Sequence, residues 1–267
     1  MVTDLLTIFS GTLVGLVLGL LGGGGSVLAV PLLLYLVGVK DPHVAIGTSA
    51  VAVSASAAIN LVLHARQRTV KWPCTITFAV SGSLGALVGA WFGKAVDGQK
   101  LLLAFAAAMV GVGISMLLRK PEAGEPDVRL SPRLAARLVP TGFVTGMASG
   151  FFGIGGGFLI VPGLIGATNM LILNAVGSSL VAVTVFGAAT ATSYAFSGLV
   201  QWNLAGLFIL GGAVGGLSGL RAGTALAGRR GMLTRIFAGF IFVTAIYVAG
   251  KALAGTSGSN LTLGARV

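Results

Sequence analysis

The sequence predicts an all-α polytopic membrane protein, built from two inverted repeats of about four to five helical segments each, with glycine-broken helical hairpins near the membrane midplane. Three observations predict this fold: the composition, an internal repeat and the placement of the basic residues. Of the 267 residues, 55% are hydrophobic and only 9% are charged, whereas soluble domains carry about 25% charged residues. The mean hydropathy is +1.00. Long uncharged stretches reach about 18 residues, the length that spans hydrocarbon.

The apolar segments follow one another along the chain with short connections. We expect helical segments at 5–21, 26–38, 44–63, 74–92, 101–118, 138–152, 157–167, 172–195, 204–220 and 232–250. Two of them, 26–38 and 157–167, fall short of the roughly 20 residues that a crossing needs. We therefore expect half-helices, re-entrant segments or shortened spans there.

One polar stretch, 119–133, interrupts this pattern with three prolines and mixed charge. Such a stretch does not bury in lipid, so it predicts a cytoplasmic linker. The linker separates a first transmembrane unit at 1–118 from a second at 134–253, and a tail follows at 254–267.

The two halves repeat one another in sequence. LLGGGGSVLAVP at 20–31 recurs as FFGIGGGFLIVP at 151–162, an offset of 131 residues, and from residue 47 onward the offset is 130. Glycines spaced four apart recur in both halves, and this spacing is typical of closely packed membrane helices. The paired glycine ladders are Gly11, Gly15 and Gly19 with Gly142, Gly146 and Gly150, and Gly85, Gly89 and Gly93 with Gly215, Gly219 and Gly223.

The basic residues predict that the two halves are inverted. If they are, 12 of the 17 Lys and Arg residues share one side and 5 the other, whereas a parallel repeat gives 10 and 7. Basic loops stay in the cytoplasm. The bias predicts a multi-pass protein with both termini outside and the linker inside.

Glycine clusters interrupt the helices at 22–26 and 153–157. Irregular backbone at bilayer depth is tolerated only where it is buried or lines a cavity. The half-helix after each break turns free N–H groups and a positive dipole end toward it, which favours an anion. The alternative is that the glycines only permit tight packing or a sharp turn. The candidate substrate-binding residues of the two breaks are Gly23, Gly24, Gly25, Ser26, Gly155, Gly156 and Gly157.

Small hydroxyls at matched helix starts extend this candidate site. Thr48 and Ser49 correspond to Ser178 and Ser179. Their hydroxyls either donate hydrogen bonds to an oxyanion or cap their helices and bond back to carbonyls. Asn60 and His64 are expected at interfacial positions.

Several functional classes find no support in the sequence. The basic residues that give the net charge of +11 lie between apolar segments rather than on a hydrophilic face. This placement does not predict a nucleic-acid binder. One cysteine and two histidines give no disulfide or metal pattern. No Walker motif or Ser/His/Asp constellation is present, so we expect neither an enzyme nor a cofactor. No Asp or Glu falls inside a predicted span, which disfavours a carboxylate proton relay.

Residues 15–38 and 146–165, each followed by a G-[TS]-S helix start at 47–49 and 177–179, resemble the TauE/SafE sulfite exporter family, also called the 4-toluene sulfonate uptake permeases. The resemblance covers residues 5 to 250. It implies a bacterial or archaeal inner-membrane secondary transporter of small sulfur-containing anions such as sulfite or organosulfonates. Ile154 departs from the glycine pattern of the first break, which weakens the equivalence of the two breaks.

The expected function is secondary transport of a small anion by alternating access between the two glycine breaks. The resemblance implies an exporter, although the sequence itself leaves the direction open. The alternatives from other classes are a passive anion channel and a non-transporting membrane assembly factor. The partners are the anion and the lipid bilayer. The sequence leaves the exact anion, the coupling ion and the oligomeric state, a homo-oligomer included, open.

Overall fold

The computed structural model describes residues 2–118, 124–125, 128–153, 157–226, 239, 242–248 and 250. These residues form helices joined by short connections, and the only extended pairing among them is an isolated bridge between Glu125 and Met170. The expected all-α membrane fold is confirmed, although most of the expected segment 232–250 lies outside the described residues. Five of the described helical stretches are long and apolar enough to cross a membrane: Val2–Val37, which contains the first glycine break, Pro42–Arg66, Trp72–Ala95, Ile172–Phe196 and Trp202–Ala222.

Each half contains a first helix, a short or broken segment and long helices. The first half consists of α1 (Val2–Leu21), the 3-10 segment η1 (Gly22–Leu28), α2 (Ala29–Leu32), the π-helical segment η2 (Leu33–Val37), α3 (Pro42–Arg66), α4 (Trp72–Ala95) and α5 (Gly98–Leu118). The second half consists of α6 (Pro132–Phe152), α7 (Gly157–Thr168), α8 (Ile172–Phe196) and α9 (Trp202–Leu226). The expected segment boundaries agree with these helices to within six residues, the largest differences being the start of α6 and the end of α9.

Local sequence explains where two of the helices begin. The Asp41 carboxylate accepts a hydrogen bond of 2.8 Å from the backbone N–H of His43 at the start of α3. The Ser131 hydroxyl accepts one of 3.3 Å from the N–H of Leu134 at the start of α6. A proline follows each cap as the first helical residue. A side-chain acceptor followed by proline is a strong signal for a helix N-terminus.

Both first helices end in the same backbone conformation. Gly22, after α1, has φ +64° and Gly153, after α6, has φ +67°. This left-handed region is open to glycine at little cost, and it ends helices. Beyond Gly22 the chain turns back along α1, because a Cβ on Gly25 would contact the backbone of Val17 and Leu18. The first glycine break is thus the tip of a hairpin.

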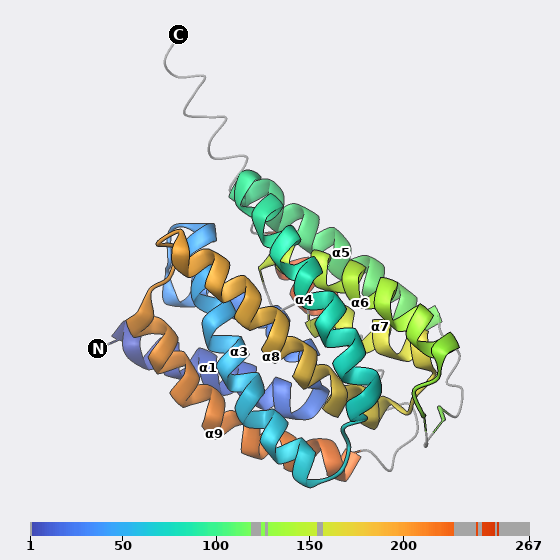
Figure 1. Ribbon diagram of the computed structural model, residues 1–267. Coiled ribbons are helices and arrows are strands. Elements are labelled where there is room, and N and C mark those ends of the chain that lie inside the picture. The colour runs from blue at the N-terminus through green and yellow to red at the C-terminus, as the bar shows by residue number, and fades with distance from the viewer. Residues whose placement is uncertain are drawn as a thin grey trace.

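The glycine ladders pack helices of one half against helices of the other (Figure 1). A Cβ on Gly11, Gly15 or Gly19 of α1 would meet the backbone of Phe208, Gly212 or Gly216 of α9 in turn. A Cβ on Gly142, Gly146 or Gly150 of α6 would meet that of Phe78, Gly82 or Ala86 of α4. Both series advance together along the chain, so α1 runs parallel to α9, and α6 to α4. The expected close packing of the ladders is present, between the first helix of each half and the fourth of the other.

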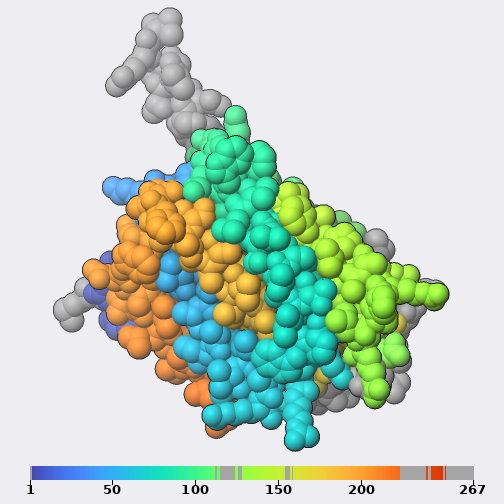
Figure 2. All heavy atoms as spheres, in the orientation of Figure 1, coloured from blue at the N-terminus to red at the C-terminus, as the bar shows by residue number. Residues whose placement is uncertain are grey.

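The helices α3 and α8 cross at the centre of the molecule. The Ser54 hydroxyl donates a hydrogen bond of 2.7 Å to the backbone oxygen of Thr184, and these are matched positions of the repeat near the middle of both helices. Further along α8, Gly187 lies against Ser54 and Ala50. The contacts move backward on α3 as they advance on α8, so the two helices are antiparallel. Figure 2 shows them side by side on a face that they share with α9, α4 and α6.

Candidate functional site

The broken segments of the two halves meet inside the molecule. Gly23 of η1 lies against Gly157, the first residue of α7, and a Cβ on either would overlap the backbone of the other. A Cβ on Gly23 would also lie 2.7 Å from Cγ2 of Val183, close to the middle of α8. The meeting point is therefore central along the long helices, where an interrupted helix leaves backbone groups to be satisfied by other means.

Two serine hydroxyls satisfy the backbone groups at this meeting point. Ser26 Oγ donates to the carbonyl of Gly23 at 2.8 Å and accepts from the N–H of Gly157 at 3.2 Å. Ser179 Oγ accepts from the N–H of Gly23 at 2.9 Å and donates to the carbonyl of Val176 at 2.7 Å. All of these bonds are buried. The backbone N–H groups of the two breaks, those of Gly23 and Gly157, therefore each donate to a serine hydroxyl.

Of the eleven candidate residues, the structure brings six together around this point. Gly23, Ser26, Gly157 and Ser179 are directly linked, and Gly24 and Gly25 are buried in the same segment. Gly155 and Gly156 lie outside the described residues. The repeat counterpart of Ser179 is Ser49, whose hydroxyl donates to the carbonyl of Ile46 at 2.8 Å.

Thr48 and Ser178 are used differently. Thr48 Oγ1 accepts from the N–H of Gln201 at 2.9 Å, and Ser178 Oγ accepts from the N–H of Lys71 at 3.0 Å. Each therefore holds the connection that precedes a long helix of the other half, α9 or α4. Their matched bonds differ from both expected uses, oxyanion binding and capping of their own helices, and neither hydroxyl is among the groups that bond to the break amides.

Two residues expected at interfacial positions, His64 and Asn60, are buried between helices. His64 is only 2% exposed, and its ring nitrogens lie 3.1 Å from the carbonyl oxygen of Gly19 and 3.2 Å from Thr69 Oγ1. Asn60 is fully buried, and its Oδ1 faces Gly216 of α9. Glycines on α1 and α9 leave room for these polar side chains between the helices, and the interfacial depth of the two residues stays a prediction.

The site region carries no buried carboxylate among the described residues. Asp4 lies in the exposed first turn of α1, Asp41 caps α3, Asp97 precedes α5 and Glu125 belongs to the linker. An anion between the breaks would therefore meet no negative side chain from this part of the chain. Hydroxyls, amide N–H groups and helix ends are the polar groups that it would meet there.

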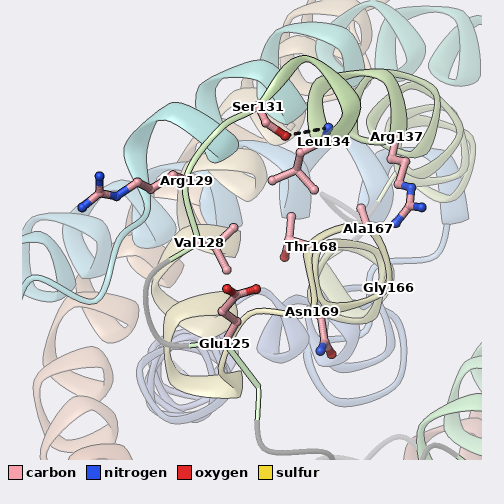
Figure 3. A pocket seen from close by; sticks show the side chains of 10 residues that line it. All are labelled: Glu125, Val128, Arg129, Ser131, Leu134, Arg137, Gly166, Ala167, Thr168 and Asn169. Atoms are coloured by element: carbon pink, nitrogen blue, oxygen red, sulfur yellow. Dashed lines mark hydrogen bonds between the residues drawn. The ribbon is translucent and has the colours of Figure 1, made fainter.

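Two pockets lie at the open ends of the two hairpins. A pocket of about 510 Å³ lies between the start of α6 and the end of α7. Figure 3 shows Arg137 and Glu125 on its opposite sides, while Arg129 points away from it. A second pocket, of about 350 Å³, lies between the start of α1 and the connection after η2. Three residues of each pocket are repeat counterparts: Leu134, Thr168 and Asn169 match Thr3, Val37 and Gly38.

Sequence reasoning missed one polar group close to the second break. Ser149 lies one turn before Gly153, is fully buried, and its Oγ has no hydrogen-bond partner among the described residues. Its repeat counterpart is Leu18, so a search for matched residues passes over it. A period-four run of polar residues on α6 is the signal that would have found it.

The fold and these contacts define a polytopic membrane protein with two helix breaks that meet at its centre. The family model described as "Sulfite exporter TauE/SafE" matches residues 7–248. A "Probable membrane transporter protein" of Xylella fastidiosa (strain 9a5c) is 50% identical over 245 residues, 91% of this chain and 94% of that protein. The "Probable membrane transporter protein YunE" of Bacillus subtilis (strain 168) is 26% identical over 232 residues, 78% of this chain and 84% of that protein.

No solved structure matches the chain. The chain belongs to the TauE/SafE family, as the glycine-broken segments and G-[TS]-S helix starts indicated. The family description and the names of the relatives agree on a membrane transporter, and this chain is one.

Proposed function

We propose that this transporter exports small sulfur-containing anions such as sulfite or organosulfonates across the inner membrane, by alternating access and without nucleotide hydrolysis. The observation that carries the proposal is the meeting of the two breaks at Gly23 and Gly157. The family description supports the class of anion. Interrupted helices that converge near the midplane are the usual binding site of secondary transporters.

The groups at the meeting point fit an oxyanion. The N–H of Gly157 opens the 12-residue helix α7, and a helix N-terminus favours a partly buried anion by roughly 0.5 to 2 kcal/mol. In this structure the two break amides donate to Ser26 and Ser179. An arriving oxyanion replaces the hydroxyls as acceptor, and each freed hydroxyl can then donate to it.

We also propose that the halves form an inverted repeat, which supplies the alternation. Two observations support it. The matched helices α3 and α8 are antiparallel, and their matched residues Ser54 and Thr184 touch. The contact of α1 with α9 is repeated by that of α6 with α4, the corresponding helices with the two halves exchanged. Rocking of one unit against the other would open the meeting point to one side and then the other.

The distribution of basic residues supports an orientation with the linker in the cytoplasm. The linker end of the molecule is the end at which α4 and α6 begin and α3 and α9 finish. The described basic residues at this end are Arg66, Arg68, Lys71, Arg129, Arg133, Arg137 and Arg221, and those at the opposite end are Lys40, Lys94 and Lys100. Cytoplasmic loops are enriched in such residues.

Flux in proteoliposomes tests the proposed function. We expect saturable sulfite uptake that is accelerated by unlabelled sulfite on the opposite side, because a carrier returns faster when it is loaded. Conductance without this counterflow would contradict the carrier and indicate a passive channel. Absence of flux under every ion gradient would contradict transport and indicate an assembly factor.

A further inference from the structure

A row of polar residues runs along one side of α6, at every fourth position. It consists of Arg137, Thr141, Thr145 and Ser149. Residues four apart lie on the same helix face. From the first to the last the row covers about 18 Å along the helix at 1.5 Å per residue, more than half of the roughly 30 Å hydrocarbon core.

The outer end of the row opens into the larger pocket. Arg137 lines the pocket of about 510 Å³ between α6 and α7 (Figure 3). The middle of the row faces α7, because a Cβ on Gly163 would lie 3.1 Å from Thr145 Oγ1 and 3.7 Å from Thr141 Cγ2. A side chain at 163 would therefore crowd Thr145 and Thr141, and glycine avoids this.

The inner end of the row is Ser149, whose hydroxyl is one of six buried side-chain polar atoms that have no hydrogen-bond partner among the described residues. A serine within a helix ordinarily donates to the carbonyl one turn earlier, as Thr141 does to Arg137 at 2.7 Å. Ser149 Oγ makes no hydrogen bond within the described part of the chain, although the residue is fully buried. A buried hydroxyl without a partner costs free energy, so the group is explained best by a ligand or water that binds there.

We infer that this row is a polar track by which a small oxyanion passes between the linker-end pocket and the glycine breaks, with Ser149 as its innermost contact. Ser149 lies one turn from Gly153, where α6 ends. Arg137 supplies positive charge at the entrance, opposite Glu125. Hydroxyls at successive turns replace water around the oxyanion as it moves inward.

The first half has no comparable row. The matched positions on α1 are Leu6, Ser10, Val14 and Leu18, of which only Ser10 is polar. The track therefore belongs to the second hairpin and to the linker end. The identity of its anion rests on the proposed function, whereas its accessibility to water does not.

Cysteine labelling in lipid nanodiscs tests the track. Cys74, the single native cysteine, is replaced by alanine, and cysteines are introduced one at a time at 137, 141, 145 and 149. The matched controls on the same helix are Val139→Cys, Phe143→Cys and Met147→Cys, whose native side chains are exposed on the outer face of α6. The probe is the anionic, membrane-impermeant reagent 2-sulfonatoethyl methanethiosulfonate.

We expect Thr145→Cys and Ser149→Cys to react at least tenfold faster than Phe143→Cys and Met147→Cys, and methanesulfonate to slow the reaction at 149. Equal rates at 143, 145, 147 and 149 would overturn the track, even in a protein that transports sulfite. Fast labelling that methanesulfonate leaves unchanged would overturn the anion contact of Ser149. Fast labelling in a protein without sulfite flux would leave the track standing and overturn the proposed cargo. Thr145→Cys decides the outcome if Ser149→Cys does not fold.

Discussion

Leucine at Gly157 is expected to reduce anion transport at least a hundredfold. Any Cβ there would overlap the backbone of Gly23, so the two breaks would be forced apart. The N–H of Gly157 would then lose its bond to Ser26. Initial rates of sulfite counterflow in proteoliposomes, normalised to reconstituted protein, measure the effect.

The matched control for this change is Gly206→Leu. Gly206 lies on α9, and a Cβ there would have nothing within 4 Å, so this variant is expected to transport at the wild-type rate. Gly157→Ala should lie between the two. Wild-type flux in Gly157→Leu would show that the contact between the breaks is not required.

Leucine at Gly146 is expected to destabilise the protein more than any change on its surface. A Cβ at Gly146 would overlap the carbonyl of Gly82, so α6 would have to separate from α4 along the whole ladder. Overpacking costs about 1–3 kcal/mol even where side chains can yield, and here the obstacle is backbone. We expect a loss of at least that size in the free energy of unfolding, measured in detergent or bicelles.

Gly206→Leu again provides the comparison, since it adds the same side chain to a transmembrane glycine without a neighbour. A matched effect is expected on the other side of the molecule for Gly15→Leu, which faces Gly212. Unfolding free energies for Gly146→Leu and Gly206→Leu that agree within error would contradict the helix pairing.

The linear order of the elements could be predicted from sequence because hydropathy and length determine it directly. Both short segments, 26–38 and 157–167, correspond to η1 through η2 and to α7. The repeat also extends to backbone conformation, because residues with positive φ occur at matched positions of the two halves. The pairs are Gly22 with Gly153, Gly38 with Asn169, and Arg68 with Gly198. Segment length, hydropathy and the conformation of single residues depend on neighbours in the chain, so the sequence pattern predicts them.

The partners of each helix could not be predicted in the same way. A glycine ladder indicates close packing but not the helix that it contacts, so the pairing of α1 with α9 emerged only in three dimensions. For the same reason Thr48 and Ser178 were grouped with Ser49 and Ser179, although their hydroxyls bond to the other half's connections. Ser149 has an apolar counterpart in the repeat and was therefore overlooked.

The central claim is that an anion binds between the two breaks, and the affinity of Ser26→Ala for sulfite tests it most directly. A ligand that binds the folded state raises its thermal stability in a saturable way, so a titration of the melting temperature gives the affinity. A hydrogen bond to a charged group contributes about 1.5–3 kcal/mol. We predict roughly ten- to hundredfold weaker binding in Ser26→Ala, and unchanged binding in Ser83→Ala, whose hydroxyl bonds only to Val80 of its own helix. Wild-type sulfite affinity in Ser26→Ala would contradict the account.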